Sequence, residues 1–286
     1  MIELKYMMPG SVRLLFLLAL TVLVACSKSP EAQFKSMECA QTPMPEYDGQ
    51  YVSLLDDETG EVLRDTLVKK IENTRNVFKP CRQYIYSAIY KDKNGALISD
   101  SRVWMMATGN RWEYQPKMQD EVVFQYAFSE EQFAEIKEFA VNKALSQHQQ
   151  FVPESTTGII ENVDVVWMHP FRSNQYHFTE VAAFPYVRLP LEIGKSWTDR
   201  LQIGEGWGDW ENTNVYSEYE IADRATVSTP YREFANCWYI ETTSSASFGN
   251  SQHNFWFDEN YGFVKMEYVN YEGQSLVFEL IEVIES

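Results

Sequence analysis

The segment "QYIYSAIYKDKNGALISDSRVWMMATGNRWEYQ", residues 83–115, decides the fold class. Stretches of aromatic and β-branched residues lie on both sides of Asn94-Gly95, which is the strongest short signal for a tight hairpin turn. A second turn is predicted at Thr108-Gly109-Asn110. The pattern predicts consecutive antiparallel strands joined by short turns.

Similar patterns extend over most of the chain after residue 46. "YVSLLDDETGEVL", residues 51–63, predicts a hairpin that turns at residues 57–60. Further strands are predicted at residues 163–167, 175–182, 195–201, 215–227, 237–244, 254–257, 263–271 and 275–284. The connections are too short for crossovers, so an antiparallel meander is expected. We therefore expect a mainly β fold, an open or half barrel with one amphipathic helix packed across it.

That helix is predicted in "SEEQFAEIKEFAVNKALSQHQQF", which starts at Ser129. Ser129 and Gln132 form a capping-box pattern, and two glutamates follow Ser129 where the helix start favours negative charge. The apolar residues fall on one face, which predicts a helix of about five turns. It either packs on the sheet or acts as a lid over the concave side.

The N-terminus has the organisation of a secretory signal. Lys5 and Arg13 precede the uncharged stretch "LLFLLALTVLVA", residues 14–25, which is shorter than the roughly 20 residues of a membrane-spanning helix. The stretch ends in Leu23, Val24, Ala25 and Cys26, and this resembles the lipobox of bacterial lipoproteins. The resemblance implies acylation of Cys26 and cleavage before it. A plain secretory signal or a retained short anchor are the alternatives.

The domain boundaries follow from this interpretation. We expect a signal peptide at residues 1–25, an acylated cysteine with a flexible tether at 26–46, and a β-rich domain at 47–286 with candidate halves 47–150 and 151–286. Ser27 follows the cysteine, whereas an aspartate there favours inner-membrane retention in Gram-negative bacteria. The resemblance thus implies a lipid-anchored protein on the periplasmic side of the outer membrane.

Charge excludes one class of partner. The chain has 24 Lys+Arg and 41 Asp+Glu, a net charge of −17. Phosphate backbones and anionic lipid surfaces repel such a protein, so nucleic-acid binding is not expected and the acyl chains must hold the membrane.

Three cysteines remain besides Cys26. Cys39 and Cys81 both lie beside turn-like sequence, whereas Cys237 lies in the apolar run "FANCWYI". We predict a Cys39–Cys81 disulfide, with Cys237 buried and free because free cysteine packs as a small hydrophobe.

The aromatic content, 17 Phe, 17 Tyr and 8 Trp, fits a β-rich core and also fits a ligand site. The loop "GEGWGDWENTN", residues 204–214, places Trp207 and Trp210 among three glycines. Exposed tryptophans there would bind a ligand, whereas tryptophans folded back would cover the core.

No catalytic or metal motif stands out in the sequence. The histidines are His148, His169, His177 and His253, and none has the spacing of a metal pair on a helix. His169 and His177 could meet across a hairpin. Motifs for a nucleophile elbow and for phosphate loops are absent, and the adjacent carboxylates point to opposite faces of a strand. We expect no enzyme activity, no cofactor and no metal.

Three segments in the last hundred residues carry a further resemblance: "PLEIGKSWTD" (190–199), "TVSTPYREFANCWYIE" (226–241) and "FWFDENYGFVKMEY" (255–268). They are similar to a pattern in uncharacterised bacterial periplasmic lipoproteins, which departs from this chain in having a glycine at the position of Arg232. The resemblance implies an antiparallel, partly open barrel and no assigned activity.

Two functions are favoured at this point, and a hydrolase whose site the sequence motifs do not reveal is the third alternative. The first is a non-catalytic binding module for an apolar, glycan or peptide ligand, for which a large hollow interior would be needed. The second is an envelope assembly partner that docks another protein, for which a filled interior and an exposed apolar patch would be expected.

Overall fold

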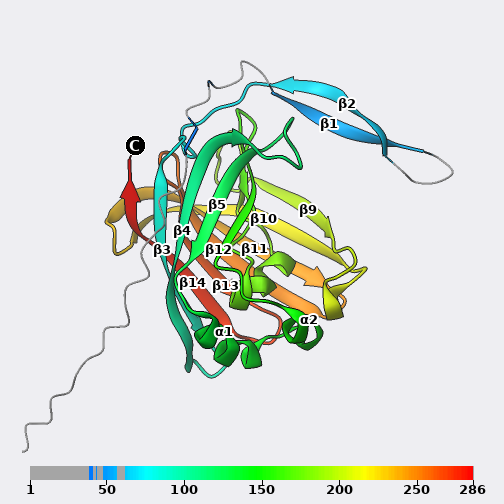
Figure 1. Ribbon diagram of the computed structural model, residues 1–286. Coiled ribbons are helices and arrows are strands. Elements are labelled where there is room, and N and C mark those ends of the chain that lie inside the picture. Colours follow the sequence, from blue (N-terminus) through cyan, green and yellow to red (C-terminus); the bar gives the residue numbers. More distant parts are fainter. Residues whose placement is uncertain (1–38, 41–42, 44–47, 57–61, 286) are drawn as a thin grey trace, which may run out of the picture. The chain divides into compact units, whose positions relative to one another are not determined.

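The computed structural model describes residues 39–40, 43, 48–56 and 62–285 (Figure 1). All of them belong to one compact unit, Ala32–Ser286. The expected signal peptide, Cys26 and most of the expected tether lie outside the described residues.

Twelve strands form one antiparallel sheet in the order β8-β7-β6-β5-β4-β3-β14-β13-β12-β11-β10-β9. They are β3 (Gln83–Lys91), β4 (Leu97–Arg111), β5 (Asp120–Tyr126), β6 (Glu154–Glu161), β7 (Val165–Met168), β8 (Tyr186–Arg188), β9 (Ser196–Gln202), β10 (Asn214–Ser228), β11 (Glu233–Ala246), β12 (Gly249–Asp258), β13 (Gly262–Val269) and β14 (Ser275–Ile284). The predicted mainly β fold and antiparallel meander are confirmed. Since β14 pairs with β3, the candidate halves share one sheet.

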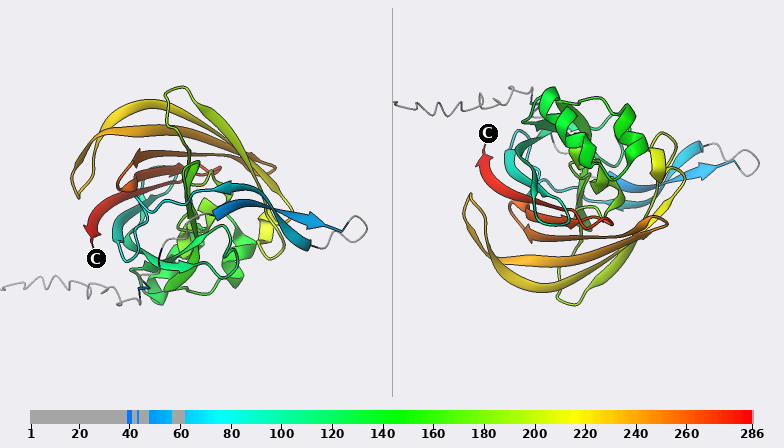
Figure 2. Two further views of the ribbon diagram at one scale, coloured as in Figure 1. Left: turned by 90° about the horizontal axis from the view of Figure 1, so that it is seen from above. Right: turned by 90° about the horizontal axis from the view of Figure 1, so that it is seen from below.

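The sheet curls into a nearly closed barrel (Figure 2). Its edge strands, β8 and β9, are consecutive in the chain but do not pair with each other. They meet through side chains instead: the Trp197 and Tyr219 rings stack with centroids 5.2 Å apart, and the Tyr186 ring packs edge-on against both. We call this line the seam.

One predicted turn is correct and one is wrong. The chain reverses at Asn94-Gly95, where Gly95 has φ +85° and the Asp92 carboxylate accepts from the amides of Asn94 and Ala96. At Gly109, by contrast, β4 continues to Arg111 despite a φ of +84°. A side chain there would collide with the Ala40 carbonyl, because an added Cβ would lie 1.9 Å from its oxygen. Gly109 therefore allows the backbone of Ala40 to approach β4 closely, and it does not reverse the chain.

The predicted five-turn helix is interrupted. The segment forms α1 (Glu130–Ile136), a 3₁₀ turn η1 (Lys137–Phe139) and α2 (Lys143–His148). The capping box of Ser129 and Gln132 is present. The helix stops because Asn142 starts a new one: its Oδ1 accepts from the Leu145 amide, while its Nδ2 donates to the Trp207 carbonyl. The helices lie at one end of the barrel (Figure 2).

The predicted strand at residues 175–182 is wrong, and its true structure fills the barrel. These residues lie in the 3₁₀ segment η2 (Asn174–Val181), in which every residue is buried. We call the connection between β7 and β8, residues 169–185, the plug. It mixes polar and apolar residues without strict alternation, so neither a strand nor an amphipathic helix suits it.

Candidate functional site

The plug packs tightly against the inner face of the sheet. The Phe171 ring lies 4.9 Å from those of Phe124 and Phe278, and Phe178 packs on Tyr90 and Tyr268. These contacts join the plug to β5, β3, β14 and β13, which lie in the middle of the sheet. The barrel interior is therefore core and not an open hollow.

Several polar groups of the plug have partners inside the barrel, whereas both side-chain amide atoms of Gln175 are buried without a hydrogen bond to the described residues. Glu180 is buried, and its carboxylate lies 3.0 Å from the Arg172 guanidinium. Burial raises the pKa of the Glu180 carboxyl, while Arg172 opposes that shift. Tyr219 donates from its hydroxyl to the Phe184 carbonyl at 3.2 Å, which fastens the end of the plug to β10. A buried polar group costs free energy unless it has such a partner.

His177 and His253 are buried and His169 is half-buried, and the three do not come together at a metal site. Burial lowers the pKa to about 3 for His169, to about 4 for His177 and to about 3 for His253, so all three are neutral at pH 7. His253 stacks on Tyr268 with ring centroids 3.8 Å apart, and its Nδ1 lies 2.6 Å from the Ala183 carbonyl oxygen. His169 and His177 both lie in the plug, not on a hairpin. No group of three potential metal ligands occurs within the described residues.

The glycine-rich loop does not offer its tryptophans to a ligand. Trp210 is fully buried, with its Nε1 donating to the Tyr271 hydroxyl at 2.9 Å. The prediction of Trp210 as a binding residue is therefore wrong. Trp207 is half-buried and stacks on Trp210 with centroids 6.5 Å apart. The loop covers the end of the barrel next to α2.

The cysteines have the arrangement that we predicted. Cys39 and Cys81 form a disulfide, with Cα atoms 5.4 Å apart. Cys237 is free and buried, and burial raises the pKa of its thiol to about 12, so it is an unreactive thiol at neutral pH. The disulfide attaches part of the expected tether to the barrel, where the Ala40 amide also donates to the Thr108 carbonyl at 2.8 Å.

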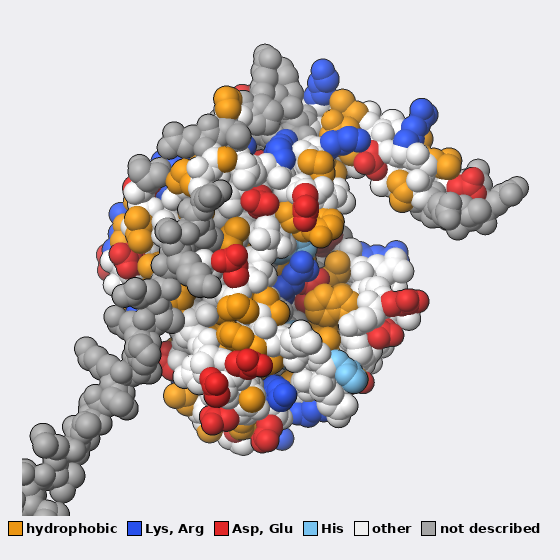
Figure 3. All heavy atoms as spheres, in the orientation of Figure 1, with side chains coloured by type: hydrophobic (Ala, Val, Ile, Leu, Met, Phe, Trp, Pro, Cys, Tyr) orange, Lys and Arg blue, Asp and Glu red, His pale blue; other side chains and the backbone are white. Residues whose placement is uncertain are grey.

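A separate two-stranded hairpin stands apart from the barrel sheet. We call it the arm; it consists of β1 (Asp48–Leu55) and β2 (Val62–Ile71), and the predicted turn between them lies outside the described residues. Six of the 14 strongly exposed large hydrophobic residues of the described chain lie on it: Val52, Leu54, Val62, Leu63, Leu67 and Val68. Figure 3 shows hydrophobic and basic side chains next to one another on the arm.

The apolar residues lie on both faces of the arm. Leu67 pairs with Tyr51, whereas Val52 is the next residue along β1 and pairs with Thr66, so Leu67 and Val52 point to opposite faces. Leu63 and Val68 lie at the two register shifts of the hairpin. Leu63 is 65% exposed and Val68 is 56% exposed. A two-stranded hairpin is marginally stable alone in water and has no second layer to bury such residues. The arm is thus an unpartnered apolar surface.

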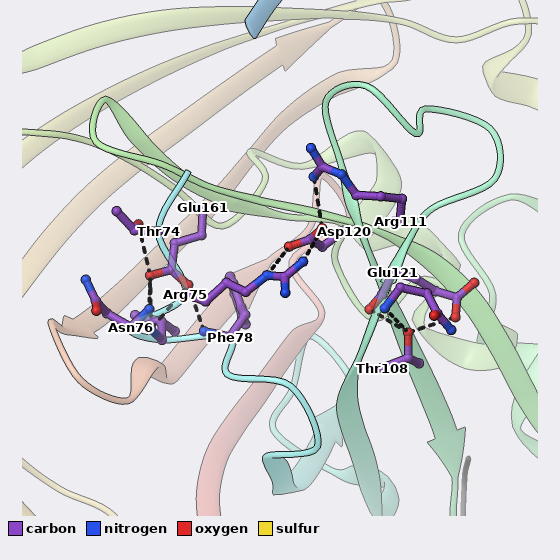
Figure 4. A network of polar contacts seen from close by, with 11 residues as sticks. Thr74, Arg75, Asn76, Phe78, Thr108, Arg111, Asp120, Glu121 and Glu161 are labelled. Atoms are coloured by element: carbon purple, nitrogen blue, oxygen red, sulfur yellow. Dashed lines mark hydrogen bonds and ion pairs between the residues drawn. The ribbon is translucent and has the colours of Figure 1, made fainter. Parts of the chain in front are cut away.

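The base of the arm is held firmly by one carboxylate. Glu161, at the end of β6, accepts from the backbone amides of Asn76, Val77 and Phe78 at 2.6–3.2 Å (Figure 4). These amides belong to the connection from β2 to β3. A carboxylate that accepts several backbone amides forms strong, charge-assisted hydrogen bonds.

Ion pairs continue this network beside Glu161. Arg75 donates to the Asp120 carboxylate from Nε at 3.0 Å, and Arg111 reaches the same carboxylate at 2.9 Å (Figure 4). Farther up the arm, Lys69 pairs with Asp164 of the barrel. Cys39 of the disulfide precedes the arm in the sequence, whereas Arg75 and the amides bound by Glu161 follow it. The arm is therefore fixed at its base and also contacted farther out by Lys117, which pairs with Asp65 at 3.5 Å and lies over the Tyr51 ring. Its large apolar side chains nevertheless stay exposed.

Sequence reasoning missed the arm and the plug as functional features. The signal for the arm was present in "VLRDTLVKKI", residues 62–71, where apolar pairs replace alternation. In a strand with alternating residues, the apolar side chains all lie on the buried face. Where two apolar residues are adjacent, a sheet with one covered face leaves one of these two side chains exposed. No comparable signal identifies the plug.

Comparisons with known proteins give no family. No protein-family model matches this chain, and no curated protein matches it in sequence. One solved structure, a candidate lipoprotein from Parabacteroides distasonis ATCC 8503, is 10% identical with a TM-score of 0.41; the match covers 73% of this chain and 97% of that one. A candidate exported protein with a YmcC-like fold from Bacteroides fragilis NCTC 9343 is 13% identical with a TM-score of 0.37, over 71% and 95% of the two chains.

Proposed function

We propose that this protein is a lipid-anchored, non-catalytic protein of the bacterial cell envelope that docks another envelope protein through its arm. The observation that carries the proposal is the contrast between a filled barrel and an exposed apolar arm. Contiguous exposed apolar surface is uncommon on monomeric proteins and marks interaction sites. The fixed base supports the same role, because a pre-oriented element loses less freedom on binding.

The filled interior weighs against the binding module expected first. A carrier needs a hollow, and the plug occupies that space with Phe171, Tyr176 and Phe178, each almost fully buried. Sugar stacking on the loop of residues 204–214 is also disfavoured, since Trp210 is buried. Docking of a protein on the arm needs neither a hollow barrel nor exposed tryptophans in this loop.

The anchor is proposed from the sequence alone. Acylation at Cys26, with the body on the periplasmic side of the outer membrane, would place the arm among other envelope proteins. Two or more acyl chains anchor stably, at about 0.8 kcal/mol per buried CH₂. No helix of the described residues is long and apolar enough to span a membrane. In cells fed a labelled fatty acid, the Cys26→Ser variant should accumulate unlabelled precursor; normal labelling would contradict the anchor.

Site-specific photo-crosslinking in cells tests the docking role. A photoreactive amino acid replaces Leu63 on the arm, and a matched variant carries it at Leu97 on β4, because these side chains are 65% and 61% exposed. We expect one discrete crosslinked product from position 63 and none from position 97. A second arm variant carries the photoreactive residue at Val68. Equal yields at positions 63 and 97 would contradict the arm as a docking element, and so would the absence of a product from both arm variants.

A further inference from the structure

A pocket lies between the base of the arm and the seam of the barrel. Its volume is about 590 Å³, within the ~300–1,000 Å³ typical of small-molecule sites. The apolar part of its lining comes from four separate segments and consists of Ile71, Met118, Ile160, Val165 and Leu189. Each of these side chains is only partly buried. The pocket therefore offers an apolar wall that a short hydrocarbon chain could cover.

The charged groups of this pocket are unusual for so acidic a protein. Arg188 and Lys195 both line it, and its single carboxylate, Asp164, already pairs with Lys69. The pocket is thus locally positive although the chain has a net charge of −17. An anion would be attracted here and repelled from most other surfaces.

Arg188 is oriented for an anion and is not neutralised. Its Nε donates to the Tyr186 hydroxyl at 2.6 Å, and its guanidinium lies over the Tyr186 ring, 5.5 Å from the centroid. Within the described residues it forms no ion pair, whereas Arg75, Arg82, Arg111 and Arg172 each pair with a carboxylate. Its two terminal nitrogens remain for a planar, bidentate acceptor such as a carboxylate.

Lys195 contributes charge and rigidity. Its Nζ donates to the carbonyls of Arg188 and Pro190, at 3.1 and 2.7 Å, and so holds the chain that leads out of β8. Arg188 also lines a second groove, in which Glu218, Glu220 and Glu241 supply negative charge. These glutamates repel an anion, so it is confined to the side of Arg188 that faces the arm.

We infer that this pocket binds an amphipathic carboxylate, with the headgroup on Arg188 and an apolar chain along Ile160, Val165 and Leu189. The inference does not depend on the docking role of the arm. Because the arm contributes Gly49, Gln50 and Ile71 to the lining, a bound ligand would touch both the arm and the barrel.

Isothermal titration calorimetry of residues 27–286, which contain the whole compact unit, tests the inference with decanoate below its micelle concentration. We expect saturable binding of decanoate, but none of acetate, which lacks the chain, or of decyltrimethylammonium, which has the opposite charge. Absence of decanoate binding, or equal binding of the cation, would overturn the inference.

Variants locate the site. Arg188→Gln should weaken decanoate binding by on the order of tenfold or more, as expected for loss of a charged hydrogen-bonding partner. Arg200→Gln is the matched control, because Arg200 also lies over a tyrosine ring, that of Tyr216, but outside this pocket. Val165→Ser should also weaken binding by shortening the apolar wall. Unchanged affinity in Arg188→Gln, or an equal loss in Arg200→Gln, would refute the assignment.

Discussion

Neither the plug nor the arm has a regular alternation of polar and apolar residues, yet the plug is almost entirely buried and the arm is mostly exposed. The plug is surrounded by a sheet of twelve strands that curls around it, so its aromatic and polar side chains find partners on several sides. The arm has only two strands and no second layer, so most of its side chains stay exposed. Apolar residues thus become core only where enough sheet encloses them, and elsewhere they remain available to a partner.

The largest expected difference between the two regions concerns stability. Phe171→Ala should lower the free energy of unfolding by about 3–5 kcal/mol, because a large aromatic side chain is lost from a closed interior. Leu63→Ala on the arm should change it by less than about 0.5 kcal/mol, since the side chain is already in water. Urea unfolding of both variants measures this. Similar losses in the two would mean that the arm is part of the core.

The disulfide sharpens the comparison, because it closes a loop of the chain that contains the arm but not the plug. Cys39 and Cys81 are 42 positions apart. Replacing both by serine should lower the free energy of unfolding by about 2–4 kcal/mol through the entropy of the unfolded chain. An unchanged unfolding midpoint under non-reducing conditions would show that the bridge does not constrain the chain.

Acid should act on the plug and its contacts before the arm. The folded pKa of His253 is lowered to about 3, against about 6.5 when exposed, so the unfolded state binds more protons between these values. Stability is complete above about pH 6.5 and falls as the pH decreases through that window. When the pH falls from 7 to 5, one such histidine lowers the free energy of unfolding by about 2 kcal/mol.

The His253→Phe variant isolates this contribution. Whatever the stability of this variant at pH 7, its free energy of unfolding should fall by about 2 kcal/mol less than that of the wild type when the pH is lowered to 5. Urea unfolding at the two pH values gives the difference. An identical pH dependence in both proteins would mean that His253 is not held neutral inside the barrel.

The smallest effect on stability is expected for substitutions at exposed positions of the arm, and these substitutions test the docking function most specifically. Replacing both Leu63 and Val68 by serine should leave the unfolding midpoint nearly unchanged, within about 0.5 kcal/mol. It should nevertheless abolish crosslinking from a photoreactive residue at position 54 on the same arm. Persistence of that product in the double variant would place the partner on another surface.

Much of the fold was predictable because strand signals are local. Asn94-Gly95 and the alternation of residues 83–90 report a hairpin directly, and the capping box at Ser129 reports a helix start. The break at Asn142 was not predictable, since it depends on a contact with the Trp207 carbonyl, which is distant in sequence.

The candidate sites were less predictable for the same reason. Cys39 and Cys81 could be paired from their turn-like surroundings, but the positive pocket requires Arg188 and Ile160 to approach across the curled sheet. Burial of Trp210 depends on Tyr271, which lies on a different hairpin. Such contacts come from the closure of the sheet, for which residue patterns give no direct signal.

Hydrogen exchange of the purified protein tests the contrast between the two regions most directly. Amides of Tyr176–Val181 that are buried in the barrel should exchange as slowly as those of β13 and β14, whereas amides of the arm should exchange orders of magnitude faster, as in locally unstable elements. If the plug exchanges as fast as the arm, the barrel is not filled, and docking through the arm loses its main support.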